Sequence, residues 1–239
     1  MELTLDRYAE LLLQFKYDGY SIYPVGKIEL PEPKLQILLR HDVDFDVFKA
    51  LQMAEAEKEI GIQSSFYFLI RSHSYNFLSP VVQEIVKKIK ALNHDIGLHF
   101  DASIYKNVKT GLLNEIEIFE NITKTKVSFI TIHRPSKIFT KDNKPIGNIR
   151  HSYEKKFFQD IGYYSDSGGS FKYGLPQDDP KYKEGNSFQL LTHPIWWTTP
   201  GSNEIEKLQF FQKERKNYFS QHVSENCIPW RKYLEKNNA

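Results

Sequence analysis

Two aspartates that lie two residues apart follow the first strongly apolar run of the chain. In an extended chain, the side chains of Asp42 and Asp44 point to the same side. Neighbouring carboxylates repel each other unless a cation or a shared proton lies between them, so this pair is a candidate metal or acid/base site. The alternative is that acidic residues here cap the helix that follows, a role that we assign to Asp46.

Further ionisable residues follow later apolar runs of the chain in the same way. They are His99 with Asp101, His133 with Arg134, Asp166, and His193. A single histidine in such a position is more often structural than functional. Five strand ends of this kind instead indicate one shared polar site, because the carboxyl ends of parallel strands converge in a barrel.

Hydrophobic periodicity predicts the elements that bring these residues together. Strands are expected at 34–42, 64–70, 94–99, 127–132, 163–165 and 188–192, and helices at 3–18, 46–59, 80–92, 115–122, 152–160 and 203–220. Strand and helix alternate about every 30 residues, which is typical of parallel βαβ units. The predicted class is therefore α/β with a parallel sheet.

Composition narrows the functional classes. The 239 residues carry a net charge of only +2 and no basic stripe, which argues against nucleic acid as a partner. Cys227 is the only cysteine, so neither an intrachain disulfide nor a cysteine-based zinc site is expected. We recognise no glycine-rich nucleotide loop, signal peptide or membrane-spanning run, and we expect a cytoplasmic protein.

The segments that carry the ionisable residues resemble the polysaccharide deacetylase family, the NodB-like members of carbohydrate esterase family 4. The likeness extends from about Leu38 to Pro194, through Leu39-Arg40-His41-Asp42-Val43-Asp44, Ile96-Gly97-Leu98-His99-Phe100-Asp101, His133-Arg134-Pro135, Tyr164-Ser165-Asp166 and Leu190-Leu191-Thr192-His193-Pro194. It implies an irregular (β/α) barrel of about seven parallel strands. It also implies a single domain over residues 1–239, with the motifs within about 34–200 and a helix added at each end.

The family likeness assigns roles to several of these residues. Asp42 resembles the catalytic base, and Arg134 resembles the arginine that orients it. Asp44, one residue later than usual, resembles the metal-binding aspartate. His193 resembles the catalytic acid, and Asp166 resembles the acidic residue that supports it.

The metal-binding motif departs from the family pattern at one position. The family carries two metal-binding histidines separated by three residues, whereas this chain has His99 followed by Ser103. The missing ligand could be replaced by Asp101, which shares a strand face with His99, or by His133. Histidine and carboxylate ligands suit Zn²⁺, and Co²⁺, Ni²⁺ or Fe²⁺ would fit the same argument.

Several residues near these motifs have alternative interpretations. Trp196 and Trp197 could offer an apolar face to a sugar ring, or they could equally be core residues. Arg71, at the end of the second strand, could contact substrate or could simply lie at the surface.

Alternation along the first strand separates its polar residues between two faces. His41 lies on the face opposite Asp42 and is expected to pack under a helix or loop, whereas Arg40 shares the face of Asp42 and could neutralise a carboxylate. His94 and His151 are expected to be ordinary exposed residues.

The sequence therefore predicts a metal-dependent hydrolase that removes acetyl groups from an N- or O-acetylated sugar. A substrate within an intracellular polysaccharide precursor would match the absence of a signal peptide. The alternatives are an amide or imide hydrolase that acts on a small non-sugar molecule, and a catalytically inactive sugar-binding member of the family. The mixed composition of the helix faces leaves the oligomeric state open.

Overall fold

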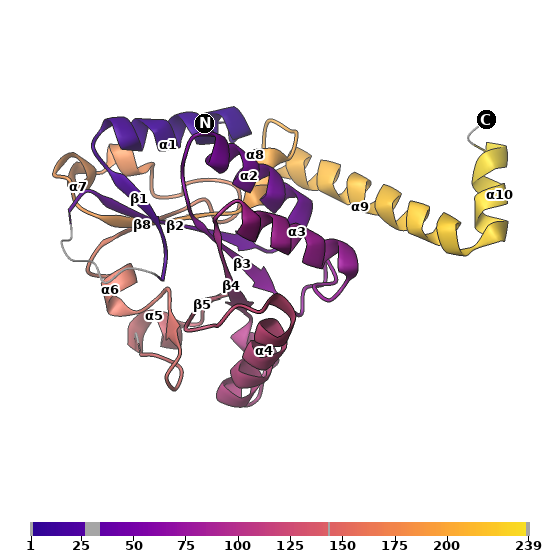
Figure 1. Cartoon of the computed structure of the whole chain (residues 1–239). Helices are drawn as coiled ribbons and strands as arrows, with labels where there is room; N and C mark the ends of the chain where they lie inside the picture. Colours follow the sequence, from indigo (N-terminus) through magenta and orange to yellow (C-terminus); the bar gives the residue numbers. More distant parts are fainter. Residues whose placement is uncertain (1, 27–33, 143, 238–239) are drawn as a thin grey trace.

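A parallel sheet lies at the centre of the molecule, as the computed structural model shows for residues 2–26, 34–142 and 144–237 (Figure 1). Its strands are β1 (Ser21–Pro24), β2 (Gln36–Val43), β3 (Ser65–Leu69), β4 (Asp95–Phe100), β5 (Phe129–Ile132), β6 (Arg150–His151), β7 (Gly162–Ser165) and β8 (Phe188–Thr192). They lie in the order β6-β5-β4-β3-β2-β8-β7, and β1 pairs with the first half of β2. All these pairings are parallel, and this arrangement confirms the predicted irregular (β/α) barrel.

Strand β2 holds the middle of the sheet because its residues suit burial on both faces. Every residue of β2 after Gln36 is buried. Ile37 and Leu39 join the large apolar cluster formed with the helices, whereas Leu38 packs inside the curled sheet with Tyr67 and Phe129. The even-numbered residues of β2 therefore face the barrel interior, which places Arg40 and Asp42 on that side.

Helices follow most strands and pack around the sheet. They are α1 (Leu5–Tyr17), α2 (Val47–Glu59), α3 (Pro80–Ala91), α4 (Val108–Thr123), α5 (Lys137–Asp142), α6 (Lys155–Phe158), α7 (Pro180–Lys183), α8 (Pro194–Thr198), α9 (Glu204–Asn226) and α10 (Ile228–Asn237), with short 3₁₀ turns η1 (Ala102–Ile104) and η2 (Pro176–Asp178). Helix α2 contacts α1, α3 and α8, so these four helices form one layer.

The start of α2 fixes the chain directly after the acidic pair. The Asp46 side chain accepts hydrogen bonds from the backbone N–H groups of Phe48 and Lys49, at 2.8 and 3.4 Å. This is the capping role predicted for Asp46. Because the helix begins at Val47, the chain must leave β2 within a few residues, and Asp44 lies at that corner.

Several elements differ from the sequence prediction. The predicted strands are present. The structure adds β1, β6, α5, α7, α8 and α10, which were not predicted; all of these except α10 have only two to six residues and show no periodicity. Helix α4 begins at Val108, earlier than predicted, because the Asn107 side chain accepts a hydrogen bond from the Thr110 N–H at 3.0 Å. Helix α6 covers only Lys155–Phe158, about half of the predicted length.

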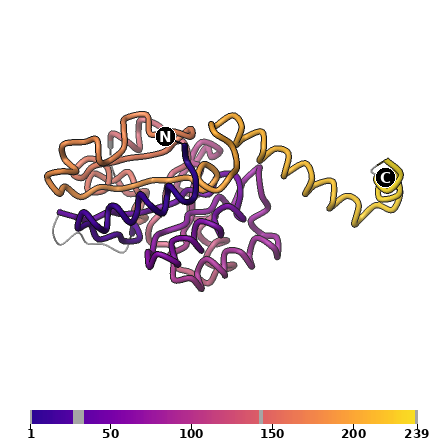
Figure 2. The backbone as a smooth tube through the Cα atoms, turned by 90° about the horizontal axis from the view of Figure 1, so that it is seen from above, coloured from indigo at the N-terminus to yellow at the C-terminus, as the bar shows by residue number. Residues whose placement is uncertain are grey.

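The last two helices, α9 and α10, extend away from the rest of the molecule. Figures 1 and 2 show α9 extending outward from the sheet and its helices, with α10 at its far end. Among the described residues, no helix combines the length and the apolar character that crossing a bilayer requires.

Candidate metal and catalytic site

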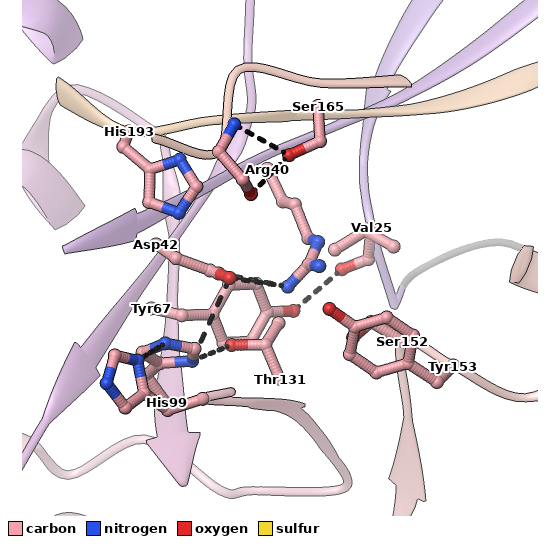
Figure 3. Close-up of polar contacts among 12 residues, drawn as sticks. Val25, Arg40, Asp42, Tyr67, His99, Thr131, Ser152, Tyr153, Ser165 and His193 are labelled. Carbon is pink, nitrogen blue, oxygen red and sulfur yellow. Dashed lines mark hydrogen bonds and ion pairs between the residues drawn. The ribbon is translucent and has the colours of Figure 1, made fainter. Parts of the chain in front are cut away.

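The carboxyl ends of five strands bring the predicted site residues to one end of the sheet. They are Asp42 and Asp44 at the end of β2, His99 in β4, His133 after β5, Asp166 after β7, and His193 after β8. Figure 3 shows the side chains of Asp42, His99 and His193 around one site, with the Arg40 guanidinium beside the Asp42 carboxylate. The parallel topology therefore assembles residues that lie far apart in the sequence.

Three of these side chains form a small triangle of ligand atoms. Asp44 Oδ1 lies 3.2 Å from His99 Nε2 and 3.2 Å from His133 Nδ1, and the two nitrogens are 3.1 Å apart. Around a metal ion with bonds of about 2.0–2.2 Å and angles of about 90–109°, neighbouring ligand atoms lie about 2.8–3.6 Å apart. The edges of the triangle match that range.

Asp44 Oδ1 is a buried acceptor that a cation would satisfy. No described group is aligned to give it a hydrogen bond. Burial raises the pKa of the Asp44 carboxyl, but the close imidazoles of His133 and His99 hold that pKa well below its usual range. A buried oxygen without a hydrogen bond is costly unless a ligand satisfies it.

The second nitrogen of His99 fixes the orientation of the ring. His99 Nδ1 lies 2.6 Å from the Thr131 hydroxyl oxygen, and both side chains are buried. When Nδ1 carries the proton and donates it to Thr131, the Nε2 lone pair faces Asp44 and His133. Metal-binding histidines usually hold their other nitrogen in this way. Thr131 is not among the residues predicted from the sequence, although it precedes His133 by two residues and so shares its side of the strand.

The donor set of the triangle fits a divalent metal ion. Asp44, His99 and His133 offer one ligand atom each, and two imidazoles with one carboxylate suit Zn²⁺ and its neighbours in the periodic table. Asp101 does not belong to this group, because its carboxylate accepts hydrogen bonds from the N–H and the hydroxyl of Ser103, at 2.9 and 2.6 Å. Of the two replacements that the sequence left open, the structure thus brings His133, and not Asp101, to the triangle.

Asp42 is held from inside the barrel by Arg40. Arg40 Nη1 donates to both carboxylate oxygens of Asp42, at 3.0 and 2.9 Å, and both side chains are buried. Arg40 Nη2 donates to the Tyr163 hydroxyl at 3.4 Å, and the guanidinium carbon lies 5.7 Å from the ring centre of Tyr153. Burial lowers the pKa of Arg40, but the Asp42 carboxylate and the Tyr163 hydroxyl raise it above its usual value. Arg40 therefore supplies a permanent positive charge beside Asp42.

This arrangement corrects the predicted role of Arg134. No hydrogen bond or ion pair joins Arg134 to Asp42 in the part of the chain that the structure describes, and the Arg134 side chain is exposed. Arg134 instead lines a cavity of about 450 Å³ together with Ser103 and Phe139, and its backbone has a φ of 46°. The physical reason is strand parity, since Arg40 lies two residues before Asp42 on the same face of β2.

His193 is fixed by a buried carboxylate. Its Nδ1 lies 2.6 Å from Asp166 Oδ1, and its backbone N–H donates to Asp166 Oδ2 at 3.0 Å. Trp197 Nε1 donates to the same Oδ2 at 2.7 Å, so Asp166 cannot rotate freely. The other ring nitrogen, His193 Nε2, lies 3.9 Å from Asp44 Oδ2. Burial lowers the pKa of His193, but Asp166, and less strongly Asp44, raise it to about 9.

The predicted substrate contacts require a further correction. Trp196 and Trp197 are 6% and 1% exposed, so neither ring offers an open face to a sugar. Both are core residues, because the short helix α8 turns them inward, and Trp197 serves the site by fixing Asp166. Arg71 is exposed beyond β3, where its Nε lies 3.7 Å from the Glu115 carboxylate, and its contact with substrate stays a prediction.

His41 belongs to a polar network on the outer face of β2, as its parity predicts. Its Nε2 lies 2.8 Å from Glu57 Oε1 in α2, and its Nδ1 lies 2.7 Å from Thr192 Oγ1 in β8. The Ser64 hydroxyl donates to Glu57 Oε2 at 2.5 Å. All of these side chains are fully buried, so the network joins α2, β2 and β8 and is closed to a substrate.

The expectation that His94 and His151 are exposed is wrong. Both side chains are buried, and each lies within hydrogen-bond distance of a backbone carbonyl oxygen. His94 Nε2 lies 3.0 Å from Ala54 O, and His151 Nε2 lies 2.8 Å from Lys144 O. Burial lowers the pKa of both imidazoles. Their partners come from distant or irregular segments, which a sequence pattern does not reveal.

Comparison with known proteins gives relatives by structure alone. No family model matches the sequence, and no curated protein matches it. The chain is similar to a solved peptidoglycan N-acetylglucosamine deacetylase, with 18% identity and a TM-score of 0.45 over 84% of this chain and 89% of the other. It is also similar to the chitin deacetylase of Colletotrichum lindemuthianum, with 13% identity and a TM-score of 0.43 over 75% and 81% of the two chains.

A third similar structure is described as a pseudoenzyme. It is a CE4 family protein from Bacillus anthracis, with 14% identity and a TM-score of 0.44 over 84% of this chain and 66% of the other. These neighbours include members of the carbohydrate esterase family that the sequence motifs resemble.

Proposed function

We propose that this chain is a metal-dependent hydrolase that removes acetyl groups from an N- or O-acetylated sugar. The observation that carries the proposal is the triangle of Asp44, His99 and His133, which has a candidate proton acceptor and a candidate proton donor near it. Asp42 is a fixed proton acceptor, and His193 is a fixed proton donor. Hydrolysis of an acetyl group needs an activated water, charge stabilisation at the carbonyl oxygen, and a proton for the leaving group.

The triangle would hold the metal ion. A divalent cation bound there supplies Lewis acidity, which makes water more acidic and polarises a carbonyl group. Asp44 would contribute a negative charge through Oδ1, and the two histidines would contribute neutral nitrogen ligands. The hydrogen bond between His99 and Thr131 keeps the His99 ring in the required orientation.

Asp42 would act as the general base. Its two oxygens share one donor, Arg40 Nη1, and a carboxylate has about four lone-pair sites, so it keeps the capacity to accept a proton from water. Asp42 Oδ2 lies 3.9 Å from Nδ1 of His99, the ring whose other nitrogen belongs to the triangle. The fixed guanidinium of Arg40 prevents the carboxylate from turning away.

His193 would act as the general acid. Against the effect of burial, Asp166 raises the pKa of His193, which favours the protonated imidazole. Asp166 holds Nδ1, so the proton on Nε2 points toward the site and can pass to the departing nitrogen or oxygen. The proposed acid thus lies beside Asp44, and the proposed base lies beside His99.

The finer points of the proposal concern the substrate and its location. We infer a sugar within an intracellular polysaccharide precursor, since a single cysteine without disulfides is typical of proteins of the reducing cytoplasm. Zn²⁺ is the metal that we propose, because two imidazoles and one carboxylate are a common catalytic zinc set.

The test compares acetate release by matched variants of the chain. Zinc-loaded protein should release acetate from N-acetylglucosamine oligomers, and Asp42→Asn and His193→Gln should each lower the rate by about 100- to 10,000-fold. Lys183→Gln, an exposed change in α7, is the control and should keep the native rate. Native activity in Asp42→Asn would refute the assignment of the base. Hydrolysis of small amides without any hydrolysis of acetylated sugars would favour the non-sugar alternative.

A further inference from the structure

The C-terminal part of the chain is anchored at its start and exposed beyond it, where Glu214 still lies 3.3 Å from Lys49 Nζ in α2. Lys207, in the first turn of α9, donates from Nζ to the carbonyl oxygens of Leu3 and Thr199, at 2.8 and 2.7 Å. Phe211 is buried and packs against Phe45, with ring centres 5.9 Å apart. Beyond Phe211, no side chain of residues 212–237, all of which the structure describes, is buried. We call residues 212–237 the C-terminal arm.

The C-terminal arm exposes large apolar side chains near its far end. Five such residues are between 37% and 66% exposed: Tyr218, Phe219, Ile228, Trp230 and Tyr233. They belong to α9 and α10, and Figures 1 and 2 show these two helices extending away from the sheet. Helices in solution gain most of their stability from packing an apolar face, so an arm of this composition requires a partner surface.

The C-terminal arm also holds the net positive charge of the chain. It carries six basic residues (Lys213, Arg215, Lys216, Arg231, Lys232 and Lys236) and three acidic ones (Glu214, Glu225 and Glu235), a net charge of +3. The whole chain has 32 basic and 30 acidic residues, so the remainder has 26 basic and 27 acidic residues and a net charge of −1. The partner that fits the arm is therefore anionic.

The corner between α9 and α10 is fixed by one side chain. Arg231 donates from Nε to the Ser224 carbonyl oxygen at 3.0 Å and from Nη2 to the Glu225 carbonyl oxygen at 3.1 Å. These bonds satisfy the last carbonyl groups of α9 and hold α10 across its end. Helix α10 therefore lies at an angle to α9, at the far end of the C-terminal arm.

Helix α10 has the composition of a helix that lies at a membrane surface. Trp230 and Tyr233 stack with ring centres 5.3 Å apart on one side of the helix. Lys232 and Lys236 are four residues apart and share a second side, which borders the aromatic one because Lys236 follows Tyr233 by three residues. Tryptophan and tyrosine on one face, bordered by lysine, are found in interfacial helices, which insert aromatic rings among lipid headgroups.

We propose that the C-terminal arm binds an anionic lipid surface and so holds the molecule at a membrane without spanning it. The basic side chains attract acidic headgroups, while Trp230 and its apolar neighbours enter the boundary between headgroups and acyl chains. A second copy of the chain is the competing partner. In a two-fold symmetric contact it would bring two arms of net charge +3 together, and like charges oppose that contact.

Vesicle binding of the full chain tests this proposal. Co-sedimentation should show binding to phosphatidylcholine vesicles that contain one third phosphatidylglycerol, and little binding to pure phosphatidylcholine. Neutralising three exposed lysines, as Lys216→Gln, Lys232→Gln and Lys236→Gln together, should weaken binding by about 100-fold, at about fivefold for each charge. Three exposed lysines elsewhere, as Lys87→Gln, Lys88→Gln and Lys183→Gln together, form the matched control and should retain native binding.

Tryptophan fluorescence gives an independent measurement at the same site. Trp230 is 37% exposed, whereas Trp196 and Trp197 are buried, so a blue shift on adding anionic vesicles would report Trp230. Trp230→Phe should abolish this shift. Equal binding of the two lysine triple variants, or no binding to anionic vesicles, would overturn the proposal. So would a dimer, seen by light scattering, that Phe219→Ser separates into monomers while vesicles bind neither form.

Discussion

The ion pair of Arg40 and Asp42 makes a sharp prediction about stability. Both side chains are buried, and one Nη1 atom bonds both carboxylate oxygens at 3.0 and 2.9 Å, so Arg40→Met leaves a buried carboxylate without its cation. Loss of one partner of a buried pair costs about 3–5 kcal/mol of unfolding free energy. In a chain of this size, that loss corresponds to a fall in Tm of about 6–20 °C.

Urea denaturation of chelator-treated protein measures this loss without a contribution from bound metal. Arg134→Met is the matched control, because Arg134 is exposed and should change the unfolding free energy by no more than about 0.5 kcal/mol. Adding Asp42→Leu to Arg40→Met replaces both charges by apolar groups and should recover most of the loss. Equal effects of Arg40→Met and Arg134→Met would refute the assignment of Arg40 as the partner of Asp42.

Three further perturbations probe other parts of the structure. Asp166→Asn removes the carboxylate that holds His193, so acetate release should fall by about 100-fold or more in protein with a native circular dichroism spectrum, and an unchanged rate would contradict the role of His193. Burial lowers the pKa of His151, so the unfolded chain binds a proton at a higher pH than the folded one. Stability should therefore fall as the pH drops below about 6.5, by at most about 1.4 kcal/mol per pH unit for this group, and urea titrations of His151→Gln should show a smaller slope. A Cβ at Gly97 would overlap the Tyr67 ring, so Gly97→Ala should cost about 1–3 kcal/mol in the same assay, and no change would show that the ring moves freely.

The sequence predicted the parallel architecture because strands and helices alternate along the chain with clear periodicity. It also predicted that Asp44, His99 and His133 lie at strand ends. This prediction requires only the position of each strand boundary, which the sequence pattern provides. The helix cap at Asp46 is equally local, because it depends on hydrogen bonds to residues two and three positions ahead.

Other features depend on contacts that no local pattern contains. Whether Asp101 or His133 completes the triangle depends on the hydrogen bond that holds Asp101 to Ser103. The burial of Trp197 depends on α8, a helix of five residues without a periodic pattern. The family likeness pointed to Arg134, whereas the parity of β2 pointed to Arg40. The structure shows that parity was the better guide to the partner of Asp42.

Metal content measures the central claim, that Asp44, His99 and His133 bind one cation, most directly. Protein dialysed against Zn²⁺ and then against metal-free buffer should retain one ion per chain, as measured by mass spectrometry of the elements. We expect Asp101→Asn to retain the ion, because Asp101 lies outside the triangle, and His133→Ala to lose it. Full retention of zinc by His133→Ala, or its loss from Asp101→Asn alone, would contradict the account.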